Sequence, residues 1–356
     1  MNNVSERMDE TPLWRKIAVN AKEVEPMTRP VPMAEVHRGD FLESVHLGHA
    51  VVARADGSLE QVWGDPDLVV LPRSSIKMIQ ALPLMESGAG ANLRGEQLAL
   101  ACASHAGEKR HVETVAAWLE ALGLDEHALC CGPQPSRDPA LFEEMIRRGE
   151  TPTRMHNNCS GKHTGFLTLA RHLGEGLDYV DPEHPVQKAV KEAFEDVTGQ
   201  PSPGFAIDGC SAPNYATTLA GLARAMARFA DAGKGSGLRD RAAATLRDAM
   251  MKHPEWMSGK GKACAEIITA ADGRAVVKTG AEGVYIAILP ELGVGIALKI
   301  ADGAGRASEL AIVGLLVRLG VLDADHPVVS RYMQRPVLNW AGLTTGFERA
   351  APGMLS

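Results

Sequence analysis

Ser74 and Lys77 lie three residues apart in the stretch LPRSSIKMIQALPL, residues 71–84, which is otherwise mostly apolar. On a helix this spacing places both side chains on one face. A serine hydroxyl becomes a nucleophile when a base lies within hydrogen-bonding reach, and a lysine can be that base when burial lowers its pKa. The same residues also fit a helix cap followed by a solvated lysine, so the motif alone leaves both interpretations open.

A second lysine motif, Lys278-Thr279-Gly280, closes an apolar segment late in the chain. A Lys-Thr-Gly triplet that ends a strand beside a helical Ser-x-x-Lys is typical of penicillin-recognising acyl-serine enzymes. The glycine lets a substrate approach the strand edge closely, and the lysine adds a positive charge near the nucleophile. The alternative is an ordinary turn into a hairpin.

The segment CASHAGE, residues 102–108, follows the strongly apolar stretch LALACA. It brings a hydroxyl, an imidazole and a carboxylate together in a few residues. Its Ser104 is placed where a second active-site serine could bridge the two lysines. The alternative is a polar loop at the end of a helix.

Two cysteine-containing turns carry further polar clusters, HNNCSGKHTG at residues 156–165 and IDGCSAP at 207–213. The first does not fit a phosphate-binding loop, because the first glycine of that spacing is missing and His163 replaces the serine or threonine. A helix beginning there still offers backbone N–H groups to a substrate carboxylate. Cys159 and Cys210 could supply two thiolates to a metal, although two cysteines on separate loops are a weak zinc signature.

The expected elements place strands at both ends of the chain and helices between them. Residues 43–54 and 59–63 read as a hairpin around the turn 55–58. Three later strands are expected at 275–278, 283–289 and 293–299. Apolar residues recurring at intervals of three and four predict helices at 74–85, 96–103, 110–122, 139–148, 161–173, 185–197, 214–232, 238–253, 262–271 and 307–319.

This order predicts an α+β fold, in which an antiparallel sheet formed from N- and C-terminal strands carries an inserted helical block. Such a layout lets a serine and a lysine from the middle helices meet a late strand. We expect residues 1–32 to form an N-terminal extension and residues 33–356 a single catalytic domain, with a helical subdomain at about 74–271.

Composition limits the partners. The chain has 356 residues, 45% of them hydrophobic and 23% charged, and a formal net charge of −7 without a basic tail, so we expect no nucleic-acid partner. No apolar run reaches transmembrane length, so no membrane partner is expected. The N-terminus lacks the apolar segment of a secretory signal, which favours a cytoplasmic location. The six cysteines form no CxxC pair and are expected to be thiols.

In this order, the segments RSSIK, CASHAGE, NNCSGKH, DGCSAP, GKAC and VVKTGAEG resemble the asparaginase II family of the Rhizobium etli inducible type, over about residues 36–346. The resemblance implies a fold like that of serine β-lactamases and glutaminases. It implies hydrolysis of L-asparagine to L-aspartate and ammonia by two serine–lysine tandems, Ser74 with Lys77 and Ser104 with Lys278. A homodimer is also implied.

The resemblance further implies a zinc ion bound by Cys159, Lys162 and Cys210 beside Asp208. The metal would shape the substrate site without being strictly required, and the lysine must be neutral to act as a ligand. We expect five residues to bind the substrate: Arg73, His163, Asp208, Thr279 and Gly280.

Other functions remain open from the sequence. A glutaminase or broader amide hydrolase of the same fold differs from an asparaginase in its relative kcat/KM for glutamine and asparagine. A β-lactamase or D-alanyl peptidase fits less well, because those enzymes act outside the cytoplasm. A catalytically silent amino-acid or metal-binding sensor would be stabilised by its ligand without releasing ammonia.

We predict that Ser74→Ala or Lys77→Ala lowers the turnover of L-asparagine by orders of magnitude, because each change removes half of a nucleophile–base pair. Ser75→Ala is the matched control and should keep most activity, since Ser75 lies outside the three-residue spacing to Lys77. Ammonia release by the purified variants measures all three. Near wild-type turnover after loss of Ser74 or Lys77 would exclude this pair as nucleophile and base.

Overall fold

The computed structural model describes residues 29–354, so the greater part of the predicted N-terminal extension lies outside the described residues. The first strand begins at Val31, so residues 31 and 32 of the predicted extension belong to the sheet. The prolines near this point suggested an irregular segment. Pro32 is instead accommodated beside a register shift between the first two strands.

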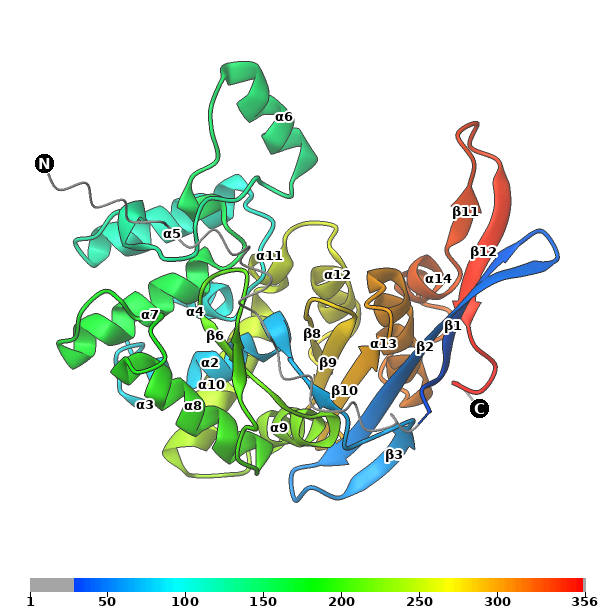
Figure 1. The fold of residues 1–356 in the computed structure, drawn as a ribbon, viewed down its shortest axis with the longest axis horizontal. Helices are drawn as coiled ribbons and strands as arrows, with labels where there is room; N and C mark the ends of the chain where they lie inside the picture. Colours follow the sequence, from blue (N-terminus) through cyan, green and yellow to red (C-terminus); the bar gives the residue numbers. More distant parts are fainter. Residues whose placement is uncertain (1–28, 355–356) are drawn as a thin grey trace, which may run out of the picture.

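An eight-stranded antiparallel sheet is built from the two ends of the described chain, as predicted (Figure 1). Its order is β11-β12-β1-β2-β10-β9-β8, and β3 pairs with β2. Two short pairs, β4 with β7 and β5 with β6, lie apart from it. The strands are β1 Val31–Arg38, β2 Phe41–Arg54, β3 Leu59–Trp63, β4 Val69–Val70, β5 Phe205–Ile207, β6 Pro213–Tyr215, β7 Thr217–Thr218, β8 Val276–Thr279, β9 Val284–Leu289, β10 Val294–Ile300, β11 Pro336–Leu338 and β12 Thr344–Ala350.

The helices fill the middle of the chain and return near its end. Three of them are short 3₁₀ turns: η1 Arg73–Ile76, η2 Glu126–Ala128 and η3 Arg154–His156. The α-helices are α2 Lys77–Gln80, α3 Leu82–Glu86, α4 Gly95–Ala101, α5 Lys109–Ala121, α6 Pro139–Arg148, α7 Ser160–Leu173, α8 Pro185–Thr198, α9 Leu219–Asp231, α10 Leu238–Lys252, α11 Pro254–Ser258, α12 Ala263–Ala270, α13 Gly305–Arg318 and α14 Pro327–Met333.

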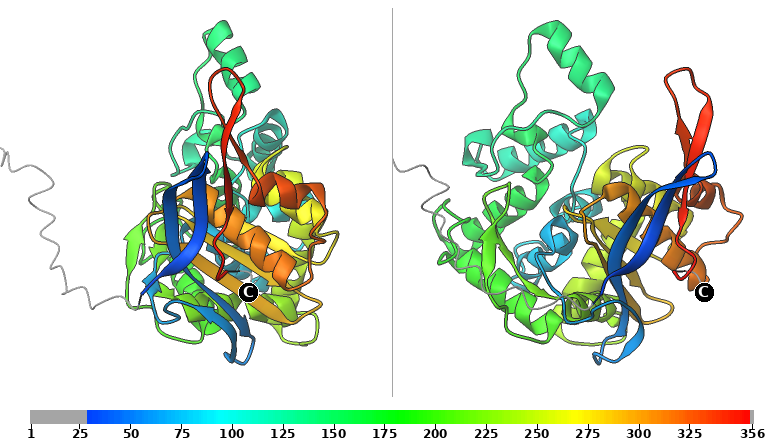
Figure 2. Two further views of the ribbon diagram at one scale, coloured as in Figure 1. Left: turned by 90° about the vertical axis from the view of Figure 1, so that its right-hand side faces the viewer. Right: turned by 45° about the vertical axis from the view of Figure 1, so that its right-hand side comes forward.

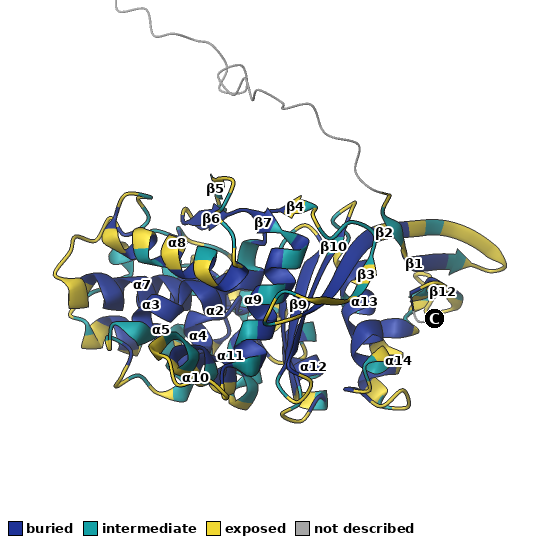
Figure 3. Cartoon of the chain, turned by 90° about the horizontal axis from the view of Figure 1, so that it is seen from below, coloured by how far each residue is buried: buried dark blue, intermediate teal, exposed yellow. Residues whose placement is uncertain are grey.

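Helices cover both faces of the sheet and bury its central strands. Helix α9 packs on β2, β9 and β10, while α13 packs on β9, β10 and β1 from the other side. Figure 3 shows the inserted helical block on the α9 side, with its inner helices buried. Every residue of β9 is buried, as is usual for a strand with helices on both faces. The α+β class and the inserted block predicted from the sequence are confirmed.

The helix predicted at 74–85 is wrong in its continuity, because the segment divides into η1, α2 and α3. Pro83 stands in the first turn of α3 and has no N–H to continue the preceding helix. Arg73 has φ 56°, in the left-handed region, so the chain turns sharply before Ser74.

The helix predicted at 214–232 begins too early. Residues 213–218 are extended and form β6 and β7, and α9 starts only at Leu219. The side chain of Thr218 accepts a hydrogen bond from Gly221 N at 3.0 Å, which is an N-cap. Paired threonines before an apolar period were the available signal for this boundary.

Three segments project from the body of the molecule (Figure 2): the β1–β2 hairpin, the β11–β12 hairpin beside it, and α6. The two hairpins carry exposed apolar side chains, among them Phe41, Trp340 and Leu343. None of the helices in the described part of the chain is long and apolar enough to cross a membrane.

We predict that Gly295→Ala destabilises the fold, because the added Cβ would lie 2.2 Å from the backbone of Ala223 and of Ala227 in α9. Overpacking of this kind costs about 1–3 kcal/mol. Gly305→Ala is the control, since no atom lies within 4 Å of its added Cβ. Urea denaturation should show a lower free energy of unfolding for the first variant only. Equal stability of the two variants would contradict the close packing of α9 on β10.

Candidate active site

Ser74 and Ser75 have different surroundings. Ser74 is partly exposed and lines a cavity of about 310 Å³. Ser75 is fully buried, and its hydroxyl donates to Pro72 O at 2.8 Å. The hydroxyl of Ser75 is therefore engaged in the local turn, while that of Ser74 faces space that a substrate could occupy.

Lys77 points toward Ser104 in this structure. Its Nζ donates to Ser104 Oγ at 3.0 Å, to Ala103 O at 2.5 Å and to Asn158 O at 3.4 Å. Within residues 29–354 no hydrogen bond joins it to Ser74. The structure thus brings Ser74 and Lys77 into adjacent turns without pairing their functional groups.

Ser104 lies between two buried lysines. It follows α4 in the loop that begins at Cys102, and Lys278 reaches it from β8 with Nζ 2.9 Å from Ser104 Oγ. Lys278 also donates to Thr279 O at 2.8 Å. A hydroxyl has one proton to donate, so one amine can donate to Ser104 while the other accepts from it. One proton can move between Lys77 and Lys278 through Ser104, along the two hydrogen bonds that join these side chains.

Burial sets the charge of these amines. It lowers the pKa of Lys77, with the nearby thiol of Cys159 opposing the shift. It lowers the pKa of Lys278 to about 7, against a partly compensating effect of Cys264. A lysine in this condition is available as a proton acceptor near neutral pH.

A thiol–amine group adjoins the first cavity. Cys159 and Cys210 line it, and Lys162, one turn into α7, donates from Nζ to Cys210 Sγ at 3.1 Å. A hydrogen bond from Cys159 lowers the pKa of Cys210 against the effect of burial, and the same contact raises the pKa of Cys159. Burial disfavours the charge on Lys162, but the two thiols outweigh it and raise its pKa.

The three predicted metal ligands are therefore brought together from the start of α7 and the loop after β5, and each is at least 94% buried. Two sulfur donors and one amine in a dry site form a donor set suited to zinc, provided that the lysine and both thiols lose their protons. Among the described residues, no cluster of three or more histidine, cysteine, aspartate or glutamate side chains is placed to hold a metal ion. The predicted set, which contains a lysine, is of a different kind.

Arg73 and Asp208 form an ion pair on the wall of the same cavity. Arg73 Nε and Nη2 donate to Asp208 Oδ1 at 3.0 and 2.7 Å. Asp208 also accepts from Gly209 N at 2.6 Å. This pair brings one positive and one negative group to the cavity that Ser74 lines.

A second, smaller cavity of about 170 Å³ lies on the Ser104 side. Ser104, Thr279, Cys264 and Arg137 are on its wall. Ser74 and Ser104 thus face different cavities, with the buried Lys77 bonded to Ser104 between them. In the part of the chain that the structure describes, no acceptor is assigned to the backbone N–H of Ser74 or of Ala281, which also lines the first cavity.

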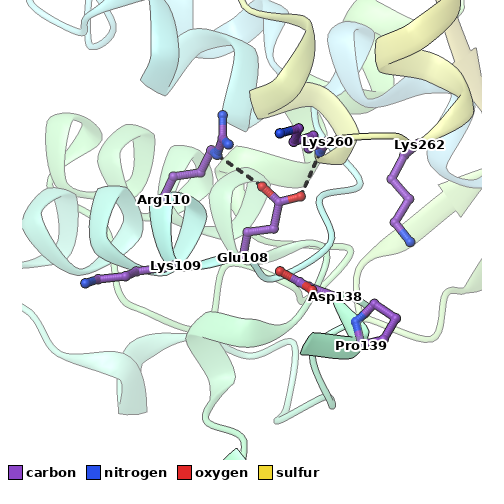
Figure 4. Close-up of a pocket in the computed structure, with 7 residues that line it drawn as sticks. All are labelled: Glu108, Lys109, Arg110, Asp138, Pro139, Lys260 and Lys262. Atoms are coloured by element: carbon purple, nitrogen blue, oxygen red, sulfur yellow. Dashed lines mark hydrogen bonds and ion pairs between the residues drawn. The ribbon is translucent and has the colours of Figure 1, made fainter. Parts of the chain in front are cut away.

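A further cavity of about 390 Å³ is shown in Figure 4, and the carboxylates on its wall are occupied by local contacts. Glu108 accepts from Lys260 N at 2.7 Å and lies 3.1 Å from Arg110 Nε. Asp138 caps α6 by accepting from Ala140 N. The candidate chemistry is therefore at Ser74 and Ser104.

Three of the five predicted substrate-binding residues, His163, Thr279 and Gly280, are not on the wall of the first cavity. His163 is fully buried, with Nδ1 2.8 Å from Tyr179 OH, and burial lowers its pKa to about 4 while contact with Cys210 opposes the shift. Thr279 lines the second cavity. A Cβ on Gly280 would lie 2.5 Å from Pro72 O, so glycine is needed for β8 to approach η1.

Sequence reasoning missed two residues that hold the site's backbone. Asn214 bonds to both backbone groups of Arg73. Arg137 donates from Nη2 to Ser104 O at 2.7 Å and to His105 O at 2.9 Å. Asn214 follows the DGCSAP segment directly, so its polarity beside Pro213 was a usable signal, whereas nothing in the sequence around Arg137 marks its reach.

A family model described as L-asparaginase II matches residues 34–350. No curated protein matches the chain. Among solved structures, it is similar to Mglu in its native form, with 16% identity, a TM-score of 0.42, and coverage of 78% of this chain and 66% of that chain, just under two thirds.

Two further solved structures are similar at low identity. A β-lactamase from Mycobacterium bovis has 15% identity and a TM-score of 0.40, with 77% of this chain and 95% of that chain covered. A β-lactamase/D-alanine carboxypeptidase from Pseudomonas syringae has 11% identity and a TM-score of 0.39, with 73% and 90% covered.

We predict that Lys278 titrates near pH 7, because burial lowers its pKa from the usual lysine value. It is then mostly neutral above pH 7 and mostly charged below, so an activity that needs neutral Lys278 falls as the pH decreases through 7. An NMR titration of the lysine side-chain nitrogens measures the pKa, with Lys278→Met to assign the signal. A midpoint at the ordinary lysine value would contradict this prediction.

Proposed function

Because the chain belongs to the L-asparaginase II family, we propose that it hydrolyses the side-chain amide of L-asparagine to L-aspartate and ammonia. The family supports an amidohydrolase, and we propose asparagine as its substrate. The observation that carries it is the Ser104 hydroxyl held between the amines of Lys77 and Lys278, beside a cavity that Ser74 lines. A binding protein has no need of two buried lysines with lowered pKa values at one serine.

Ser74 is the proposed nucleophile. Neutral Lys77 takes the hydroxyl proton of Ser74 while Ser74 Oγ forms a bond to the side-chain amide carbon of asparagine. Hydrogen bonds of this kind often tighten only when substrate is bound, so Lys77 is expected to turn from Ser104 to Ser74 at that stage. The free N–H groups of Ser74 and Ala281 are the proposed donors to the oxyanion.

Ser104 and Lys278 are proposed to carry the proton onward. Lys77 then returns to Ser104, and the proton that it took passes through Ser104 and Lys278 to the leaving nitrogen as the C–N bond breaks and ammonia departs. Water then attacks the acyl-enzyme, and the freed Ser74 regains its proton. The hydrogen bonds from both lysines to Ser104, at 3.0 and 2.9 Å, support this relay.

The ends of the substrate are proposed to meet charges on the cavity wall. The guanidinium of Arg73 suits the α-carboxylate and the carboxylate of Asp208 suits the α-amino group. Their mutual ion pair keeps both groups in place in the absence of substrate. The start of α7, with its backbone N–H groups, is the further proposed carboxylate contact. His163, Thr279 and Gly280 stay predicted as substrate-binding residues.

Cys159, Lys162 and Cys210 would hold the zinc ion that the family resemblance implies. When bound, the metal supplies a fixed positive charge beside the substrate cavity. His163, whose buried Nε2 has no assigned hydrogen-bond partner, lies against Cys210 and would orient that thiolate.

A homodimer is also proposed, as the resemblance implies. The exposed side chains of Phe41, Trp340 and Leu343 on the two projecting hairpins offer apolar surface for a second copy. Sedimentation velocity of the full chain distinguishes a dimer from a monomer.

We predict that the purified protein releases ammonia from L-asparagine with a higher kcat/KM than from L-glutamine, and that it does not hydrolyse a penicillin. The assay is run with and without a chelator. Chelation is expected to weaken asparagine binding more than turnover, because the metal shapes the substrate site. Higher kcat/KM for glutamine would support a glutaminase, and substrate-induced stabilisation without ammonia release would support a sensor.

A further inference from the structure

The side chain of Asn214 holds the backbone that precedes Ser74. Asn214 lies on β6 and is 2% exposed. Its Oδ1 accepts from Arg73 N at 3.1 Å, and its Nδ2 donates to Arg73 O at 3.3 Å. A single buried amide thus binds both polar groups of one residue's backbone, as a neighbouring strand would.

Arg73 needs such support because its φ is 56°. Residues with a side chain rarely adopt this left-handed conformation, and those that do are held by their surroundings and gather at functional sites. Relaxation of Arg73 to negative φ would break both hydrogen bonds with Asn214 and leave the buried amide of Asn214 unpaired. The clamp and the strained backbone therefore support each other.

The backbone angle of Arg73 fixes two groups of the site at once. The guanidinium of Arg73 is tied to Asp208, and the next residue is Ser74. On the other side, Pro72 O accepts from both the backbone N–H and the hydroxyl of Ser75. A change of φ at Arg73 would rotate Ser74 relative to Asp208 and disrupt the turn that Ser75 closes on Pro72 O.

We propose that Asn214 is a positioning residue for Ser74: its side-chain amide holds Arg73 in the left-handed conformation that directs the Ser74 hydroxyl into the substrate cavity. This inference rests on the proposed function, in which Ser74 is the nucleophile. It assigns to Asn214 no contact with the substrate, since Asn214 is not on the cavity wall.

The test compares two substitutions of Asn214 by steady-state kinetics on L-asparagine. Asn214→Leu is close in size and can form neither hydrogen bond. We expect kcat to fall about 100-fold with KM changed by less than about threefold, because misdirection of a nucleophile affects the reaction more than binding. Asn214→Asp keeps the acceptor for Arg73 N and loses the donor to Arg73 O, so an intermediate loss of kcat is expected.

Tyr215→Phe is the matched control. Tyr215 is the next residue on β6, and its hydroxyl donates to Gln187 O at 3.3 Å without touching Arg73. This variant should retain full kcat. Thermal melting of every variant sets an assay temperature at which all are folded, because a purely structural role of Asn214 would lower the melting temperature and leave kcat unchanged.

Ser74→Ala separates this inference from the proposed function. If Ser74→Ala is inactive and Asn214→Leu keeps kcat within about threefold of wild type, the positioning role is overturned and the proposed function stands. Should Asn214→Leu fail to fold, the kcat of Asn214→Asp decides in the same way. Activity in Ser74→Ala overturns both.

Discussion

Complete burial of two lysine amines is the constraint on which the site depends. Lys77 and Lys278 are 1% and 0% exposed, and an ammonium ion without solvent or a counter-charge costs several kcal/mol. The amines respond by a lowered pKa, which makes them bases. The fold provides the dry surroundings by pressing the helical block, which carries Lys77, against the sheet edge, which carries Lys278.

The same interface explains why a glycine and a strained residue are found at the site. Gly280 lets the end of β8 come close to the turn before Ser74. A side chain at position 280 would push the helical block away from the sheet. Arg73 takes its left-handed conformation at the same junction. Both features serve close approach between an element from the middle of the chain and one from its end.

Much of the candidate site could be predicted from short motifs in the sequence. The spacing of Ser74 and Lys77, the Lys-Thr-Gly triplet and the cysteine turns were visible because each lies within a few residues. The order of strands and helices gave the α+β class because helical and strand periods differ clearly in this chain. The family resemblance then linked the motifs to one another.

Contacts between distant segments could not be predicted from local spacing and residue pattern. The hydrogen bond of Lys77 to Ser104, with Ser74 on a separate cavity, depends on side-chain directions that spacing does not give. Asn214 was assigned to a helix, although tertiary pairing with β5 makes its segment extended. The burial of His163 behind Cys210 likewise depends on how α7 packs, which a polar motif does not reveal.

The topology of the sheet has a consequence for how the protein is made. A chain leaves the ribosome from its N-terminus, so β2 emerges long before its partner β10, although Arg54 pairs with Val294. The helical block is therefore synthesised while the strand that completes its apolar interface is still absent. Folds with such distant pairings form slowly and expose apolar surface meanwhile. Ser74 and Lys77 remain in an unfinished, wet environment until β8 is synthesised, so the burial that lowers the pKa of Lys77 is established only after the sheet edge has formed.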